Sequence, residues 1–369
     1  MKYLKLLLLF LVFSCADKTL DIETQFAELF DKQFTENEPG GSILVKKGSE
    51  IIFLKNYGVA DINTKEKITE NTLFNTGSIS KTFVANGILI LEEENKLAIE
   101  DPILKYFKDF TNTKIAKKVT VKHLLAHNSG LPDARKVSEN FEFYLTAEDK
   151  ENFEPLKHVS SLKFEPGEKF EYSNPAYNGL ALIIEKASNQ KWQRFIEKRI
   201  FEPSGMKHSK ITDGDYPSLG VSHAYQKENG VYKEYDYGEY STFTAAGNGG
   251  VWSSVLDLAK YEEAIQNHVF LGEKAIEKSR TIYHPENWKD TSIPKIGCGW
   301  FIVEKNDKQN KLEVKIVSHT GSQGGFRSFY ISIPEKNIVY IALFNRPVKN
   351  MGEMRTKGLA LLKKYNWLD

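Results

Sequence analysis

Cysteine is scarce in this chain. Only Cys15 and Cys298 occur among 369 residues. Removal of a leader over residues 1–14 would leave Cys298 as the only other cysteine, so no intrachain disulfide framework is expected. A chain of this length with 41% hydrophobic residues can bury a large core. It can form one large domain or two closely joined ones.

The chain also lacks an excess of charge of either sign and a long apolar run. Lys and Arg number 50 and Asp and Glu 49, which leaves a net charge of +1 without a long run of either sign. This balance gives no electrostatic case for a nucleic-acid or polyanion partner. The apolar block at residues 6–13 is far too short to cross a bilayer as a helix.

The residues that flank this apolar block are typical of a secretory signal peptide. Lys2 and Lys5 precede it and Ser14 follows it, which is the order of basic start, apolar core and small residue. The stretch Val12-Phe13-Ser14-Cys15 resembles the lipobox of bacterial lipoproteins, whose cysteine is acylated and becomes the first residue. The alternative is ordinary cleavage beside a coincidental cysteine.

We therefore expect residues 1–14 to be a lipoprotein signal peptide, Cys15 to carry lipid, and residues 15–24 to form a tether. The protein is then exported and contacts a bacterial membrane through its lipid anchor only, facing the periplasm or the cell surface.

The hydrophobic pattern from residue 25 to residue 369 changes period along the chain. Helical and strand-like stretches are expected at residues 23–34 (helix), 42–45 and 51–54 (hairpin), 298–303, 312–316, 329–333 and 338–344 (strands) and 351–365 (helix). Short hairpin connections imply an antiparallel sheet. The sequence predicts an α+β fold in which this sheet is flanked by the N- and C-terminal helices, with a mostly helical subdomain inserted at roughly residues 85–245.

Two catalytic signatures are absent. No Gly-x-Ser-x-Gly elbow occurs, which argues against an α/β-hydrolase, and no His-Glu-x-x-His zinc motif occurs. His123 and His127 are four residues apart in a predicted helix, a spacing that can hold zinc, but no third ligand is evident nearby. We expect neither a metal nor a cofactor.

A Ser-x-x-Lys motif is informative only in context. It occurs five times, at Ser78, Ser160, Ser188, Ser204 and Ser292. Only Ser78 follows an apolar run and a glycine and opens a long helical pattern, with apolar residues at Ile79, Phe83, Val84, Ile88 and Leu91 on one face. A serine in this place lies near backbone N–H donors that can stabilise an oxyanion.

Lys81 is an unusual residue for the first turn of that helix. If Ser78 were only a helix cap, Glu or Gln would be favoured three residues later. A lysine there opposes the helix dipole by about 0.3–1 kcal/mol. Ser78 and Lys81 project from one face, and a lysine whose pKa is lowered by burial can activate a serine.

Two more motifs follow in order, Tyr172-Ser173-Asn174 and His319-Thr320-Gly321. With Ser78-x-x-Lys81, they resemble the three motifs of the class C β-lactamase and low-molecular-weight penicillin-binding-protein family. Flanking residues 123–132, 205–206 and 324–327 agree, and the resemblance extends over residues 25–345. No Ser-Asp-Asn is present, which argues against class A. The resemblance implies a β-lactamase/transpeptidase-like fold over residues 25–369.

The resemblance also implies roles for single residues. Ser78 would be the acyl-accepting nucleophile, Lys81 would help to deprotonate it, and Tyr172 would be the principal base or a proton shuttle. For Tyr172 taken alone, the alternative is a core aromatic whose hydroxyl is satisfied locally.

The other motif residues would bind the substrate. Asn174 would contact its amide, or else cap a helix before Pro175. His319, Thr320 and Gly321 would line its polar end, and the backbone N–H groups of Ser78 and Ser322 would form an oxyanion hole.

One departure from the family pattern narrows the expected function. Dedicated class C β-lactamases usually have lysine where this chain has His319, and histidine is mostly neutral above about pH 6.5. The histidine form is more similar to DD-peptidases, D-amino-acid peptidases and esterase-like relatives.

We expect a serine hydrolase that forms an acyl-enzyme with a small amide or ester, such as a D-amino-acid peptide or a β-lactam. A carboxylesterase, or a non-catalytic binding or scaffold protein on the same fold, is the alternative. Loops 133–160 and 211–245 are expected to line the pocket.

Overall fold

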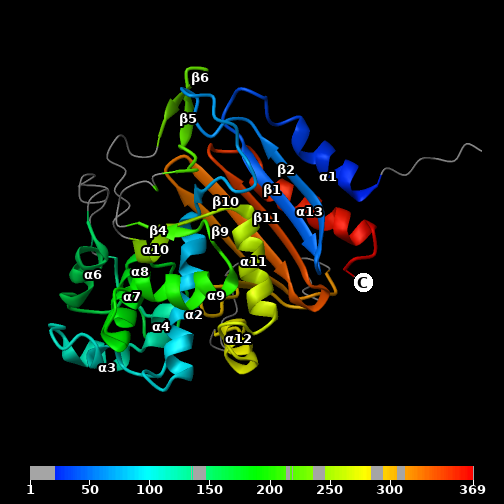
Figure 1. The fold of residues 1–369 in the computed structure, drawn as a ribbon. Coiled ribbons are helices and arrows are strands. Elements are labelled where there is room, and N and C mark those ends of the chain that lie inside the picture. Colours follow the sequence, from blue (N-terminus) through cyan, green and yellow to red (C-terminus); the bar gives the residue numbers. More distant parts are fainter. Residues whose placement is uncertain are drawn as a thin grey trace, which may run out of the picture.

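The computed structural model describes residues 21–133, 135, 147–212, 217, 219–235, 246–283, 294–305 and 312–368. Its centre is a six-stranded sheet in the order β2-β1-β11-β10-β9-β8, in which all neighbouring strands are antiparallel. These strands are β1 (Gly41–Lys47), β2 (Glu50–Tyr57), β8 (Phe301–Val303), β9 (Ile316–Gln323), β10 (Phe326–Ile333) and β11 (Ile338–Phe344). The sheet thus joins the start of the chain to its end, as Figure 1 shows, and the predicted α+β class is confirmed.

The terminal helices cover one face of this sheet. They are α1 (Ile22–Asp31) and α13 (Met351–Lys364), which lie together in Figure 1. Phe26 and Phe30 of α1 are fully buried and their rings lie 5.7 and 6.2 Å from the ring of Phe53 on β2. Burying such aromatic rings contributes about 1.5–3 kcal/mol each, so both ends of the chain hold the sheet.

The first helix begins before its predicted start. Asp21 accepts a hydrogen bond from the Thr24 backbone N–H at 2.7 Å, and this cap starts α1 at Ile22. Residues 22–24 therefore belong to the helix rather than to the predicted tether. The predicted signal peptide and Cys15 lie outside the described residues.

The other helices belong to the central part of the chain, and one of them, α11 (Val255–Gln266), packs on the opposite face of the sheet against β1 and β11. They are α2 (Ser80–Glu93), α3 (Thr113–Lys118), α4 (Val121–Leu125), α6 (Asp149–Lys157), α7 (Asn174–Ser188), α8 (Trp192–Ile196), α9 (Glu202–Ser204), α10 (Ala246–Gly249), α11 (Val255–Gln266) and α12 (Glu273–Ser279). Shorter turns are η1 (Gly77–Ile79), η2 (Ile103–Lys105), η3 (Glu197–Phe201) and η4 (Pro334–Lys336). Small sheets are formed by β3 (Phe74–Asn75), β7 (Val251–Ser253) and β4 (Lys210–Ile211), and by β5 (Tyr225–Glu228) and β6 (Val231–Glu234).

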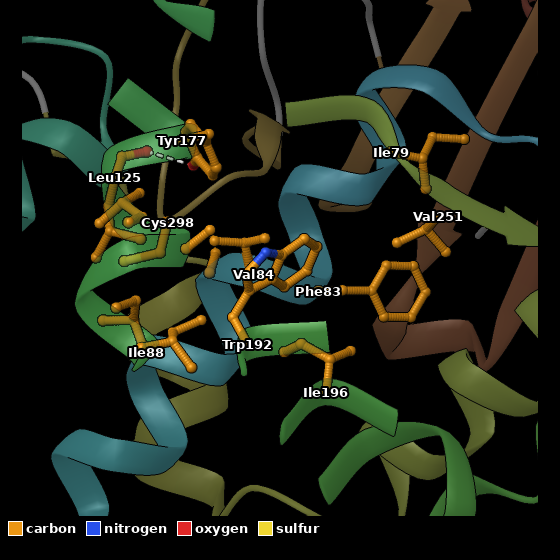
Figure 2. Close-up of a cluster of buried hydrophobic side chains, with 14 of the residues drawn as sticks. Ile79, Phe83, Val84, Ile88, Leu125, Tyr177, Trp192, Ile196, Val251 and Cys298 are labelled. Carbon is orange, nitrogen blue, oxygen red and sulfur yellow. Dashed lines mark hydrogen bonds between the residues drawn. The ribbon is translucent and has the colours of Figure 1, made fainter. Parts of the chain in front are cut away.

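Helix α2 is the axis of this helical part. The sequence predicted one buried face, but every residue from Ser80 to Leu91 is buried. Figure 2 shows Phe83, Val84 and Ile88 inside a cluster that also receives Trp192 and Ile196 of α8. The one-face prediction was wrong because helices on several sides enclose α2, and a central helix needs no polar face.

Two predicted strands differ from the observed ones in their bounds: β8 begins at Phe301 and β9 at Ile316, the last residue of the predicted strand 312–316. Residues 298–300 do not join β8, because Gly299 has a left-handed φ of +73° and the Gly297 N–H bonds to the Trp300 carbonyl in a tight turn. Residues 312–315 likewise precede β9. Within the described residues, no helix is long and apolar enough to cross a membrane.

Candidate active site

Ser78 lies in the 3-10 turn η1, which directly precedes α2. Neither η1 nor α2 has a side-chain cap, so the interpretation of Ser78 as a helix cap is wrong. The turn is held from two sides. Thr76 donates its backbone N–H and its hydroxyl to the Val251 carbonyl at 2.9 and 2.8 Å, and Ser328 of β10 donates to the Thr76 carbonyl at 2.9 Å. The nucleophile candidate is therefore attached to both the helical part and the main sheet.

Lys81 is buried beneath Ser78. Its Nζ lies 3.1 Å from Ser78 Oγ and donates to the Asn248 carbonyl at 2.6 Å. The residue is fully buried, and burial first, then the nearby positive charge of Arg135, lowers the Lys81 pKa well below its usual value. No carboxylate is hydrogen-bonded to Nζ within the described residues. A neutral amine at this place can accept the Ser78 proton.

Tyr172 is also in contact with Ser78. The Ser78 side chain influences the pKa of its hydroxyl, and Lys81 Nζ lies 5.1 Å from the centre of its ring. Burial raises the Tyr172 pKa to about 12, although the Ser78 hydroxyl acts in the opposite direction. The residue keeps 36% of its surface exposed, so it is no core aromatic. At neutral pH Tyr172 is a phenol that can donate a proton, not a tyrosinate.

Strand β9 brings the third motif beside the Ser78 turn. A Cβ atom at Gly77 would lie 2.7 Å from the Ser322 backbone nitrogen, which shows how closely the turn approaches β9. Gly77 has a φ of +54°, and glycine alone meets both requirements without strain. The close approach brings the turn that carries Ser78 next to Ser322, whose backbone N–H is the second predicted oxyanion donor.

Next to the Ser78 turn, one edge of β9 has no paired strand among the described residues. Strand β8 pairs only with residues Ile316 to Ser318, whereas His319 to Gln323 pair only with β10 among the described residues. An unpaired strand edge presents backbone donors and acceptors to an extended ligand. Thr320, Gly321 and Ser322 lie along this edge, and the structure thus brings them together with Ser78, Lys81 and Tyr172.

Asn174 is the first residue of α7 and lies two residues after Tyr172. The cap of that helix is Ser173, whose hydroxyl accepts the Ala176 N–H at 3.3 Å. The cap interpretation of Asn174 is therefore wrong, because the neighbouring residue already fills that position.

His319 is buried in neutral form. Burial and then the charge of Lys81 lower its pKa to about 3. Its Nδ1 lies 2.7 Å from the Thr320 carbonyl, which can only accept, so Nδ1 carries the proton. His319 therefore supplies no positive charge near Tyr172, unlike the lysine expected at this position in class C β-lactamases.

Because His319 is buried in neutral form, we expect the free energy of unfolding to depend on pH. Its folded pKa lies below the unfolded value, so the unfolded state binds the extra proton and stability is lost as pH falls from about 6.5 towards 4. His319→Asn keeps an N–H for Thr320 and is expected to reduce that slope, by up to about 1.4 kcal/mol per pH unit. Urea unfolding of the wild type and of His319→Asn between about pH 6.5 and pH 4 measures this slope. Identical slopes would show that His319 takes up its proton in the folded state.

His123 and His127 do not form a metal pair. His123 Nδ1 accepts the Thr120 backbone N–H at 3.1 Å, whereas His127 lies beyond the end of α4 with a φ of +52°. Within the described residues, no group of three or more His, Cys, Asp or Glu side chains could hold a metal ion. His127 instead stacks on Tyr172, with ring centres 4.2 Å apart.

Sequence reasoning missed Asn248, which orients Lys81. The Asn248 side chain donates to Asn178 at 3.1 Å, and Asn178 donates to the buried Asp149 carboxylate at 2.6 Å. Asp149 also accepts the Gly247 N–H at 3.0 Å. This chain fixes the carbonyl that accepts from Lys81. Its only signal in the sequence was the run Gly247-Asn248-Gly249-Gly250, which has no catalytic pattern.

Parts of the two loops predicted to line the pocket lie outside the residues that the structure describes. Residues 134 and 136–146 of loop 133–160, and residues 213–216, 218 and 236–245 of loop 211–245, are not among the described residues, and the structure does not test their role.

Comparisons with known proteins agree with this geometry. Penicillin-binding protein 4* of Bacillus subtilis is 28% identical over 340 residues, which are 88% of this chain and 72% of that protein. Protein flp of Staphylococcus aureus (strain MW2) is 27% identical over 321 residues, 83% of this chain, and the chain spans only 59% of its length.

Solved structures have the same fold. The octameric penicillin-binding protein homologue from Pyrococcus abyssi has a TM-score of 0.73 at 29% identity, over 92% of this chain and 75% of that chain. D-amino acid amidase from Ochrobactrum anthropi SV3 has a TM-score of 0.77 at 21% identity, over 94% and 100%. The second likeness concerns the fold alone.

A sequence profile described as Beta-lactamase matches residues 26–363, which is most of the chain. The resemblance drawn from the three motifs is thereby confirmed. This chain belongs to the Beta-lactamase family of serine hydrolases.

Proposed function

We propose that this protein hydrolyses a small amide through an acyl-enzyme on Ser78. One observation carries the proposal: Ser78 Oγ lies 3.1 Å from the Nζ of the buried Lys81, and the Ser78 side chain interacts with the Tyr172 hydroxyl, beside an edge of β9 that no described strand pairs. Nucleophile, base and proton donor are thus within reach of one another.

Lys81 is the base in this proposal. The neutral amine takes the Ser78 proton as Oγ attacks the substrate carbonyl carbon, and the carbonyl oxygen becomes an oxyanion held by the N–H groups of Ser78 and Ser322. Tyr172 passes a proton to the leaving nitrogen, the C–N bond breaks, and the acyl group stays on Ser78. Water then attacks the ester, and the same groups return Ser78 to its hydroxyl form.

The proposed substrate is a short peptide or amide of a D-amino acid. A relative is named as a penicillin-binding protein, and a protein of the same fold is named as a D-amino acid amidase. An extended peptide can pair with the edge at His319 to Gln323, which no described strand occupies. The neutral His319 does not supply the fixed positive charge expected of a dedicated class C β-lactamase. We therefore propose amide or peptide turnover rather than efficient β-lactam turnover.

Covalent labelling tests the function. The protein is incubated with a fluorophosphonate or with a fluorescent penicillin and then digested for peptide mapping. We expect both probes to modify Ser78 and neither to label Ser78→Ala. A matched control is Ser160→Ala, which removes the serine of another Ser-x-x-Lys match at an exposed position and should be labelled normally.

Each labelling outcome separates the candidates. Labelling by the fluorophosphonate alone would favour a carboxylesterase. If the folded protein takes up neither probe, a binding or scaffold role replaces the enzymatic one.

A further inference from the structure

His127 is the residue in closest association with Tyr172 that the proposed chemistry does not use. It is 1% exposed and lies outside any helix or strand. Its φ of +52° belongs to the left-handed region, which histidine adopts only at an energetic disadvantage. Its Nε2 has no hydrogen-bond partner within the described part of the chain. A strained, incompletely bonded residue is a poor choice for stability alone.

The backbone around Tyr172 depends on His127 on both sides. The Glu171 N–H donates to the His127 carbonyl at 2.8 Å, and the Ser173 N–H donates to His127 Nδ1 at 3.0 Å. Tyr172 itself is in neither a helix nor a strand, so no ladder of regular hydrogen bonds holds it. The two bonds to one residue therefore bracket the tyrosine.

The third contact is between the rings. The imidazole stacks on the Tyr172 ring at 4.2 Å between centres and 24° between planes, and the ring of Tyr177 lies 4.9 Å from it. Tyr177 is anchored by donating its hydroxyl to the Leu125 carbonyl at 2.7 Å. The imidazole is thus held between a fixed ring and Tyr172, which limits rotation of the Tyr172 side chain.

We infer that His127 is a positioning residue that holds the Tyr172 hydroxyl against Ser78. The inference rests on the proposed function, because it gives His127 a role only through Tyr172. The Nδ1 bond to Ser173 is the main holding contact, since the loss of its acceptor leaves a buried N–H unsatisfied directly after Tyr172. Misplacing a reacting group by about 1 Å can lower a rate on the order of 100-fold.

Two substitutions distinguish the effect of the Nδ1 hydrogen bond from the effect of ring stacking. His127→Phe keeps a ring for stacking but has no acceptor for the Ser173 N–H. His127→Asn has an oxygen near the place of Nδ1 and suits the left-handed backbone, but it has no ring. We expect the rate constant for fluorophosphonate labelling of Ser78 to fall at least about tenfold in His127→Phe and to stay close to wild type in His127→Asn.

The matched control is His123→Asn in the same segment. His123 bonds to Thr120 and its ring lies beside Gly167, not beside Tyr172. This variant should keep the wild-type labelling rate even if its thermal stability falls. Rates are normalised to the final labelled fraction, so that unfolded protein does not enter them.

A double-mutant cycle tests whether His127 acts through Tyr172. In the Tyr172→Phe background Lys81 remains as base, so labelling is slower but measurable, and adding His127→Phe should cause no further loss. An equal fold-loss in both backgrounds would overturn the inference, as would equal losses in His127→Asn and His127→Phe. If the unsubstituted protein is not labelled at all, the proposed function fails first. If it is labelled and His127→Phe reacts at the same rate, only the role of His127 is refuted.

Discussion

Replacing Lys81 by arginine is expected to lower the rate of Ser78 acylation on the order of 10³-fold or more. A guanidinium keeps its proton at every accessible pH, so it cannot accept the proton of Ser78. The native lysine can, because burial lowers its pKa well below the usual value. The rate of fluorophosphonate labelling measures the change.

Lys81→Met shows whether activity is lost through the missing base or through unfolding. The methionine side chain has similar length and no charge, so it fills the buried site without requiring a proton. In the wild type, unfolding lets the neutral lysine take up a proton, which favours the unfolded state at neutral pH. We expect Lys81→Met to melt no lower than wild type while losing the labelling reaction.

Lys105→Met is the control, since Lys105 is an exposed lysine paired with Asp101. It should be labelled at the wild-type rate. Normal labelling of folded Lys81→Met would contradict the assignment of Lys81 as the base.

Gly321→Ala is the second substitution with a large expected effect. A Cβ atom at Gly321 would overlap the Thr76 carbonyl oxygen and the Ser328 hydroxyl. One of these is backbone and cannot rotate away, so β9 and the Ser78 turn must move apart. The Ser78 and Ser322 N–H groups then separate. Loss of one oxyanion donor commonly lowers kcat by about 10²–10³-fold, and we expect a loss of that size.

The comparison variant is Gly352→Ala in α13, where an added Cβ meets no atom within 4 Å. Both variants add one methyl group at a glycine, but only Gly321→Ala should lose activity. Thermal melting checks that each variant is folded. Full labelling activity in folded Gly321→Ala would show that β9 does not supply an oxyanion donor.

Local patterns in the sequence were sufficient for the main elements of the fold. The predicted hairpin at 42–45 and 51–54 became β1 and β2, and the predicted helix at 351–365 became α13. Strand β2 and helix α13 contact solvent on one side, so their hydrophobic period records which side is buried. Strand β1 is buried on both faces and appears in the sequence as a short continuous apolar run. Helix α2 departed from its predicted one-sided burial because it is enclosed by elements from distant parts of the chain.

For the site, the sequence by itself determined which residues we propose for the chemistry. Ser78, Lys81 and Tyr172 were identified from short motifs, since a nucleophile and its base must keep a fixed spacing on a turn or helix. Their protonation states were decided only by the tertiary structure. The pKa of Lys81 depends on complete burial and on Arg135, and that of His319 on burial beside Lys81.

The placement of Tyr172 was likewise decided by the tertiary structure. Its neighbours bond to His127, which is 45 residues away in the sequence, and the carbonyl that orients Lys81 comes from Asn248. Desolvation and hydrogen bonding depend on which atoms surround a group in space, and a motif contains only the residues adjacent to it in the chain.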